Sequence, residues 1–170
     1  MHEFNLDVGK CDLQALLQQQ SNLWQKVTKP RDFILNWGPN TPLHIFIDEG
    51  RIIQALTILI ENAHKYSHPE APINLEVTTS KGYVHMNVVD SGDGISSSDL
   101  AHIFERFVRL KRKGDGMGIG LSIAKAIAEA HSGHLSASST LGKGSVFTLS
   151  LPINQRAPTE IPTQTKEICI

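Results

Sequence analysis

The chain has 170 residues, of which 40% are hydrophobic, and a formal net charge of −1. This composition is typical of one folded globular domain, and the near-neutral charge argues against a general nucleic-acid-binding surface. No apolar run is long enough to span a bilayer, and no secretory signal begins the chain. The two cysteines, Cys11 and Cys169, and the eight histidines have no disulfide-framework or metal-ligand spacing. We therefore expect a protein of the reducing cytoplasm.

The first third of the chain predicts one helix and a pair of strands. Residues 4–8 are either a short strand or a lead-in to a helix that Asp12 caps. The apolar side chains of that helix share one face: Leu13, Leu16, Leu17 and Trp24. Residues 33–37 and 43–47 follow, and the turn residues at 38–40 predict that these two segments pair as a hairpin.

A long helix is predicted from Asp48 to about Tyr66. Apolar residues recur along it at helical spacing: Ile52, Leu56, Leu59 and Ala63. Alternating patterns around turn residues predict two more hairpins, which pair these segments: 73–78 with 83–89, and 134–138 with 145–151. Shorter helices are expected over 96–104 and 118–131, and the polar segment 153–170 is expected to be a disordered tail. Because an amphipathic helix must bury one stripe of side chains, we expect the main helices to form one layer on a mixed sheet, in an α+β fold.

The glycines at 116, 118 and 120 lie where the helix pattern over 118–131 begins. Glycine lets backbone N–H groups approach a ligand closely, and a helix N-terminus attracts anions, so this run indicates either a phosphate site or only a flexible loop. Its spacing excludes a dinucleotide-binding fingerprint, which needs Gly-x-Gly-x-x-Gly directly after a strand. A second glycine-containing segment, Gly-Lys-Gly-Ser at 142–145, lacks the first glycine of a P-loop and is typical of a hairpin turn.

Two further motifs could contribute to the same site. Asp90 ends a strand and is followed by Gly92 and Gly94, so its carboxylate could accept a hydrogen bond from the amino group of a base; the alternative is a common Asp-Gly turn. Asn62 and Lys65 lie three residues apart on one helical face. There an amide oxygen could bind Mg²⁺ and an ammonium group could neutralise phosphate, whereas the alternative is a solvated helix end.

The order of the motifs is more specific than any one of them. An Asn box over 61–67 is followed by Asp-Ser-Gly-Asp-Gly-Ile at 90–95, by Phe-Glu-Arg-Phe at 104–107 and then by the glycine run, and Gly-Lys-Gly-Ser at 142–145 leads into the last strand. This order resembles the catalytic and ATP-binding domain of sensor histidine kinases, within the superfamily of gyrase, heat-shock chaperone, histidine kinase and mismatch-repair ATPases. The resemblance covers about residues 4–152. It implies the Bergerat fold, a two-layer α/β sandwich with three main helices on a mixed sheet of about five strands.

The resemblance also implies roles for individual residues. Asn62 corresponds to the Mg²⁺ ligand and Lys65 to a phosphate-facing lysine, and we expect both to act in catalysis together with Arg109, which follows the phenylalanine segment that anchors the ATP lid. Periodicity alone would also make that segment a core-facing helix. Asp90 corresponds to the residue that binds the adenine amino group. The other residues expected to contact ATP are Tyr66, Gly92, Gly94, Ile95, Phe107, Gly116, Gly118, Gly120 and Leu121.

Three features depart from the family pattern. Ile58 occupies the position of a second asparagine one turn before Asn62, so part of the expected polar network around Mg²⁺ is missing. Met117 stands where a small hydroxyl residue is usual. The lid segment between Leu110 and Gly116 is short, and its basic residues either contact phosphate or are merely solvated.

No histidine lies in the His-Glu-x-x-x-Pro context of a family phosphoacceptor. We therefore expect the acceptor on a missing upstream segment or another chain, with residues 1–26 joining that dimerisation and phosphotransfer hairpin to an ATP-binding domain over 27–152. The implied partners are ATP or ADP, the hairpin and a downstream response regulator, without nucleic acid. The isolated domain is expected to be monomeric, and the full-length protein could be membrane-anchored. The alternatives are a nucleotide-binding regulatory module without kinase turnover and a serine kinase of the same superfamily.

Overall fold

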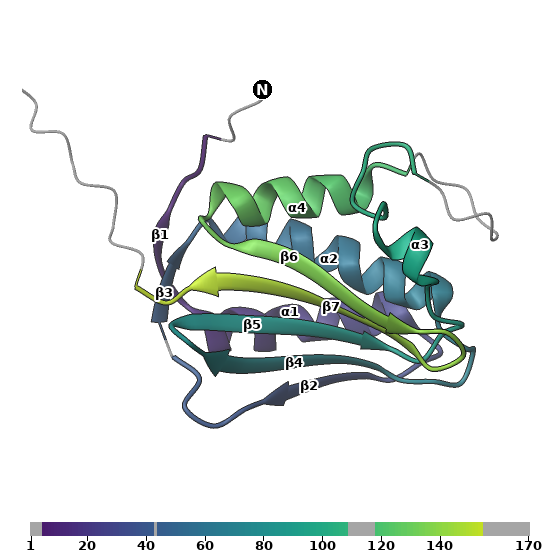
Figure 1. Ribbon diagram of the computed structural model, residues 1–170. Coiled ribbons are helices and arrows are strands. Elements are labelled where there is room, and N and C mark those ends of the chain that lie inside the picture. Colours follow the sequence, from purple (N-terminus) through teal and green to yellow (C-terminus); the bar gives the residue numbers. More distant parts are fainter. Residues whose placement is uncertain (1–4, 43, 109–117, 155–170) are drawn as a thin grey trace, which may run out of the picture.

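The computed structural model describes residues 5–42, 44–108 and 118–154. Within them, three helices cover one face of a five-stranded mixed sheet (Figure 1). The strands lie in the order β2-β4-β5-β7-β6 and have these bounds: β2 Phe33–Trp37, β4 Ile73–Ser80, β5 Tyr83–Asp90, β6 His134–Thr140 and β7 Gly144–Pro152. The three helices of the layer are α1 Leu13–Thr28, α2 Glu49–Tyr66 and α4 Gly120–Ala130. The predicted α+β, two-layer architecture is confirmed.

Aspartate caps begin the two longer helices, as predicted. The carboxylate of Asp12 accepts a hydrogen bond from the amide of Ala15 at 3.0 Å, and that of Asp48 accepts one from the amide of Arg51 at 3.0 Å. Such caps satisfy amide groups that have no partner within a helix. The face of α2 that packs on the sheet carries its buried residues: Ile52, Ala55, Leu56, Leu59, Ile60 and Ala63.

The predicted hairpin of residues 33–37 and 43–47 is wrong. The strand β2 pairs in parallel with β4, whereas β3, His44–Ile47, pairs antiparallel with β1, Gly9–Asp12, in a separate two-stranded sheet. Residues 5–8 are therefore a lead-in without regular structure. The alternating pattern of each segment specifies a half-buried strand but not its partner, because it only sorts side chains between two faces.

The other two predicted hairpins, β4 with β5 and β6 with β7, are confirmed. Because β5 also pairs with β7, β5 is the central strand of the sheet. The helix predicted over 96–104 is shorter: α3 spans Ser97–Leu100, and the hydroxyl of Ser96 caps it by accepting a hydrogen bond from the amide of Asp99 at 3.2 Å. In the described part of the chain, no helix is both long and apolar enough to cross a membrane.

One hydrophobic core lies between the sheet and the helices. The helix α1 belongs to it, since it buries Leu13, Leu17 and Trp24 in the same cluster as the apolar residues of α2, α4 and the sheet. The indole Nε1 of Trp24 donates a hydrogen bond to the hydroxyl of Thr57 on α2 at 3.0 Å. The first two helices are thus joined by packing and by a polar contact.

Candidate nucleotide-binding site

Asp90 is the last residue of the central strand, and only 6% of it is exposed. Its Oδ1 accepts a hydrogen bond from the amide of Gly92 at 2.9 Å. Burial raises the pKa of the Asp90 carboxyl above its ordinary value, although hydrogen bonds from the amides of Gly92 and Ser145 and the nearby His68 offset part of this effect. A buried carboxylate at a strand end can accept a further hydrogen bond from the amino group of a base.

The loop after Asp90 contacts the C-terminal end of α2 through Gly92. This glycine forms an antiparallel bridge with Ser67, directly after the helix. A Cβ atom at position 92 would lie 2.2 Å from the carbonyl oxygen of Tyr66, closer than any side chain can approach. The absence of a side chain at Gly92 therefore lets Asp90 lie beside the helix end that carries Asn62.

On its other side, the same loop contacts the turn between β6 and β7. A Cβ atom at Gly94 would lie 2.2 Å from the carbonyl oxygen of Thr140. The amide of Ile95 donates a hydrogen bond to the hydroxyl of Ser139 at 2.7 Å, and the amide of Gly142 donates one to the carbonyl of Asp93 at 2.8 Å. The loop over 91–95 is thus held between α2 and the last hairpin.

The last turn of α2 presents Asn62, Lys65 and Tyr66. Asn62 is half-buried, and its side-chain amide makes no hydrogen bond to another described residue. Lys65 and Tyr66 are exposed, with the Lys65 Nζ 5.4 Å from the centre of the Tyr66 ring. The chemistry of these groups fits Mg²⁺ and phosphate, since an amide oxygen is a hard ligand and an ammonium group neutralises charge.

The described residues hold no group of three or more His, Cys, Asp or Glu side chains that could bind a metal ion. A divalent ion at Asn62 would therefore depend on phosphate oxygens and water for most of its ligands. This is the usual situation of Mg²⁺ in nucleotide sites, because the ion dehydrates reluctantly and is rarely enclosed by protein alone.

The N-terminus of α4 lies beside α2 at the same end of the molecule (Figure 1). Gly120 is the first residue of α4, and a Cβ atom there would lie 3.2 Å from the Cγ2 of Ile58. The N-cap residue, Ile119, makes no side-chain capping hydrogen bond. The first amide groups of α4, including that of the half-buried Leu121, therefore lack the capping partner that α1 and α2 have and can bind an anion.

The phenylalanine segment divides between the core and the surface. Phe104 packs edge-on against Phe147 of β7, with ring centres 6.4 Å apart, whereas Phe107 is 73% exposed. The amide of Phe107 donates a hydrogen bond to the carbonyl of Gly118 at 3.0 Å. The residues that flank the segment 109–117 on either side are thus joined. Several features of the sequence lie outside the described residues: Arg109, Leu110, the basic residues of the lid segment, Gly116, Met117, Cys169 and the predicted tail from residue 155 on.

Sequence reasoning missed two serines beside Asp90. Ser145 pairs with Asp90 across β5 and β7, is 6% exposed, and has its hydroxyl 3.0 Å from that of Ser139. Ser139 in turn binds the loop at Ile95. The sequence pattern marks position 145 only as the end of a turn and the start of the last predicted strand, and no spacing rule connects it with residue 90. The signal lies in the strand pairing.

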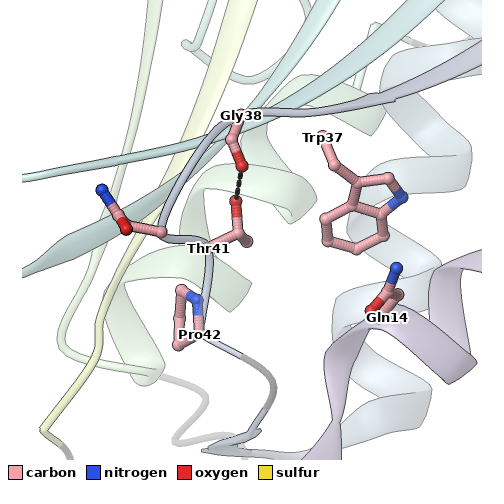
Figure 2. A pocket seen from close by; sticks show the side chains of 6 residues that line it. Gln14, Trp37, Gly38, Thr41 and Pro42 are labelled. Atoms are coloured by element: carbon pink, nitrogen blue, oxygen red, sulfur yellow. Dashed lines mark hydrogen bonds between the residues drawn. The ribbon is translucent and has the colours of Figure 1, made fainter.

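A separate shallow pocket lies between α1 and the segment that follows β2 (Figure 2). Trp37 on β2 pairs with Val77 on β4, and Val77 pairs with Met86, which precedes Asp90 by four residues along β5. The pocket therefore lies away from the end of the sheet that carries Asp90. The hydroxyl of Thr41 donates a hydrogen bond to the carbonyl of Gly38 at 2.8 Å within this pocket. Its lining contains none of the predicted nucleotide-site residues: Gln14, Trp37, Gly38, Asn40, Thr41 and Pro42.

A helix layer on a mixed sheet, with a buried aspartate beside a helix end that carries unpaired polar groups, defines a nucleotide-binding α+β domain. The profile of the family described as "Histidine kinase-, DNA gyrase B-, and HSP90-like ATPase" matches residues 47–155, more than half of the chain. The chain therefore belongs to this family, as a catalytic, ATP-binding domain of the sensor histidine kinase type.

Individual relatives agree. Sensor histidine kinase YkoH of Bacillus subtilis (strain 168) is 40% identical over 152 residues, which are 85% of this chain and 32% of YkoH. The adaptive-response sensory kinase SasA of Synechococcus elongatus is 34% identical over 146 residues, which are 83% of this chain and 36% of SasA. The chain thus spans about a third of the length of these two relatives.

Solved structures are similar over most of the chain. Full-length ShkA in complex with AMPPNP has a TM-score of 0.77 and 28% identity, covering 92% of this chain and 33% of ShkA. The catalytic domain of the histidine kinase ThkA, in a nucleotide-free form, has a TM-score of 0.73 and 25% identity, covering 87% of this chain and 99% of that domain. The described fold is therefore that of a histidine kinase catalytic domain.

Proposed function

We propose that this domain binds ATP together with Mg²⁺ and transfers the γ-phosphoryl group to a histidine on a separate dimerisation and phosphotransfer domain, from which a response regulator receives it. The observation that carries the proposal is the buried carboxylate of Asp90, in contact through Gly92 with the helix end that presents Asn62 and Lys65. Groups suited to a base and groups suited to phosphates thus lie on adjoining elements.

Asp90 would select adenine. The 6-amino group of adenine donates a hydrogen bond to a carboxylate, whereas guanine has a carbonyl oxygen at this position and would place two acceptors together. A site built to pair with one donor discriminates strongly, because the mismatched base leaves a buried polar group unpaired. The residues proposed to surround the base and ribose are Tyr66, Gly92, Gly94 and Ile95.

Asn62 would hold Mg²⁺, and Lys65 and the first amide groups of α4 would contact the phosphates. When bound, the ion offsets phosphate charge and fixes the orientation of the γ-phosphoryl group. The remaining residues proposed to act near the phosphates are Phe107, Arg109, Gly116, Gly118, Gly120 and Leu121. Arg109 would stabilise charge during transfer.

The transfer requires positioning and charge neutralisation rather than a nucleophile from this chain. A neutral imidazole nitrogen of the acceptor forms the new bond to the γ-phosphorus. The bond from that phosphorus to the β–γ bridging oxygen breaks, and ADP leaves with its electron pair. The transferred product is a phosphohistidine.

Titration calorimetry with Asp90→Asn tests the base-binding role. Loss of the charged acceptor should weaken ATP binding by roughly tenfold or more, since a hydrogen bond to a charged group contributes about 1.5–3 kcal/mol. Asp99→Asn, an exposed carboxylate on α3, is the matched control and should bind as the wild type does. Equal affinity of the Asp90→Asn variant and the wild type would refute the role.

The transfer itself is tested by mixing the domain, radiolabelled ATP and a separately produced dimerisation and phosphotransfer domain. An acid-labile, base-stable label on the second protein indicates phosphohistidine. An acid-stable label would instead indicate a serine kinase, and no label would refute turnover under these conditions.

One observation favours a second function, a nucleotide-binding regulatory module without turnover. Ile58 faces Gly120 of α4 and provides no polar group one turn before Asn62, where the family pattern has an asparagine. Titration of ATP with and without Mg²⁺ separates the two functions. A kinase domain should bind ATP more tightly with Mg²⁺, and an affinity independent of Mg²⁺ together with no transferred label would favour the regulatory module.

A further inference from the structure

Arg31 lies between α1 and β2, and its side chain reaches the C-terminal end of α2. Its Nη1 donates a hydrogen bond to the carbonyl of His64 at 2.7 Å, its Nη2 to the carbonyl of Ser67 at 2.9 Å, and its Nε to the carbonyl of His68 at 3.1 Å. Nη1 also lies 2.7 Å from Nδ1 of His64. One guanidinium group therefore joins three backbone carbonyls at the end of the helix that carries Asn62 and Lys65.

The backbone of Arg31 is itself fixed to α1. Its amide donates a hydrogen bond to the carbonyl of Thr28 at 3.0 Å, and its carbonyl accepts one from Nε2 of Gln25 at 2.9 Å. The Oε1 of the same glutamine accepts a hydrogen bond from the amide of Phe33 at 2.9 Å. Because the origin of the side chain is held in place, its planar group of donors is oriented before it binds α2.

The carbonyls that Arg31 binds belong to the segment that contacts the Asp90 loop. Ser67, whose carbonyl Arg31 binds, pairs with Gly92, and the amide of His68 donates a hydrogen bond to the carbonyl of Ser91 at 3.3 Å. The last carbonyls of a helix have no partner within it, and Ser67 is only 7% exposed, so its carbonyl needs a partner from the protein. The guanidinium group of Arg31 supplies that partner and, because its donors have a fixed geometry, also fixes the position of the segment.

We infer that Arg31 is a positioning residue of the nucleotide site: it fixes Asn62 and Lys65 relative to Asp90 by holding the end of α2. The inference rests on the proposed roles of Asn62 and Lys65. It implies that Arg31 affects binding of the phosphates and Mg²⁺ more than binding of the base, because the Asp90 loop is also held from its other side, by the hydrogen bonds of Ile95 to Ser139 and of Gly142 to Asp93. A displacement of about 1 Å at such a site is enough to weaken function substantially.

The test compares Arg31→Met, Arg31→Lys and Arg51→Met with the wild type. Titration calorimetry measures the Kd for Mg²⁺-ATP and for adenosine, at a temperature where circular dichroism shows each variant folded. For Arg31→Met we expect the Kd for Mg²⁺-ATP to rise about tenfold and the Kd for adenosine to change less than about twofold. The Kd of Arg31→Lys for Mg²⁺-ATP should lie between those of the wild type and of Arg31→Met, because an ammonium group cannot reach three carbonyls in the fixed geometry of a guanidinium group. Arg51, in the first turn of α2, is the matched control, and its variant should bind as the wild type does.

The outcomes separate the inference from the proposed function. Wild-type affinity for Mg²⁺-ATP in Arg31→Met, or an equal loss for adenosine and Mg²⁺-ATP, would overturn the positioning role while leaving the proposed function intact. A wild type whose affinity for ATP does not depend on Mg²⁺ would refute the role of Asn62 and the inference with it. If Arg31→Met does not fold, Arg31→Lys carries the comparison with the same criteria.

Discussion

Replacing Gly92 by alanine tests whether the contact between the Asp90 loop and α2 builds the site. The added Cβ atom would lie 2.2 Å from the carbonyl oxygen of Tyr66, 3.0 Å from its carbonyl carbon and 3.0 Å from Oδ1 of Asp90. Two of these three atoms belong to the backbone of the helix end and cannot rotate away. The loop must therefore move away from α2.

The expected cost follows from what this movement breaks. Overpacking a well-packed position costs about 1–3 kcal/mol, and the movement also strains the bridge to Ser67 and the 2.9 Å hydrogen bond from the amide of Gly92 to Asp90. A hydrogen bond to a charged group contributes about 1.5–3 kcal/mol. We expect a loss of about 3 kcal/mol in the free energy of unfolding, which lowers Tm by about 6–12 °C in a domain of this size.

Scanning calorimetry measures the shift in Tm, and titration calorimetry measures the affinity for ATP, which should fall because Asp90 loses the contact that orients it. Gly50→Ala on α2 is the matched control. Its Cβ atom would meet only Oδ1 of Asp48, at an ordinary 3.6 Å, so the variant should be about 0.5–1 kcal/mol more stable than the wild type. A Gly92→Ala protein with wild-type Tm and wild-type affinity for ATP would refute the reasoning.

Three further predictions follow from burial. Burial raises the pKa of Asp90, and base binding needs its carboxylate. ATP affinity should therefore fall on acidification at a pH where an ordinary aspartate, with a pKa of about 3.9, is still charged. Calorimetric Kd values that stay constant down to about pH 4 would contradict this. Thr57→Val removes the hydrogen-bond acceptor of the buried Trp24 indole. The free energy of unfolding, measured with urea, should fall by about 1–3 kcal/mol. A decrease below about 0.5 kcal/mol would show that the indole finds another partner. Burial and the Glu49 carboxylate raise the pKa of Cys11 to about 12. Mass spectrometry should therefore find Cys11 unmodified by iodoacetamide at about pH 8 until the protein is unfolded. Rapid labelling of the folded protein would count against the burial of Cys11.

Local patterns predicted the elements well and the strand partners less well. The long helix to Tyr66 and two hairpins followed from periodicity, caps and turn residues, all of which act over a few positions. The hairpin of 33–37 with 43–47 was wrong because both segments alternate and a turn separates them, which satisfies the rule for a hairpin. In the structure β2 pairs with β4, and β3 pairs with β1. Which strand edge is available for pairing depends on the packing of the whole chain, which a local pattern does not contain.

The same distinction applies to the site. The order of motifs identified Asn62 and Asp90 as candidates, because each lies in a short segment with its own pattern. Ser145 and Arg31 had no such signal, since each acts on a residue far away in the sequence: Ser145 on Asp90 through strand pairing, and Arg31 on the end of α2 through its side chain. Residues that hold other residues in place are visible only in the folded structure.

The two halves of the site differ in how they are held, and this has a consequence for binding. The loop over 91–95 is held by backbone contacts at Gly92 and Gly94 on both of its sides, so the base half is formed before nucleotide arrives. The phosphate half depends on the long, exposed side chain of Lys65 and on the side-chain amide of Asn62, which makes no hydrogen bond to another described residue. Ordering flexible side chains costs binding free energy that a pre-formed loop does not lose. Adenosine should therefore bind with a smaller entropic penalty than Mg²⁺-ATP, and substitutions at Arg31 should act on the difference between the two ligands.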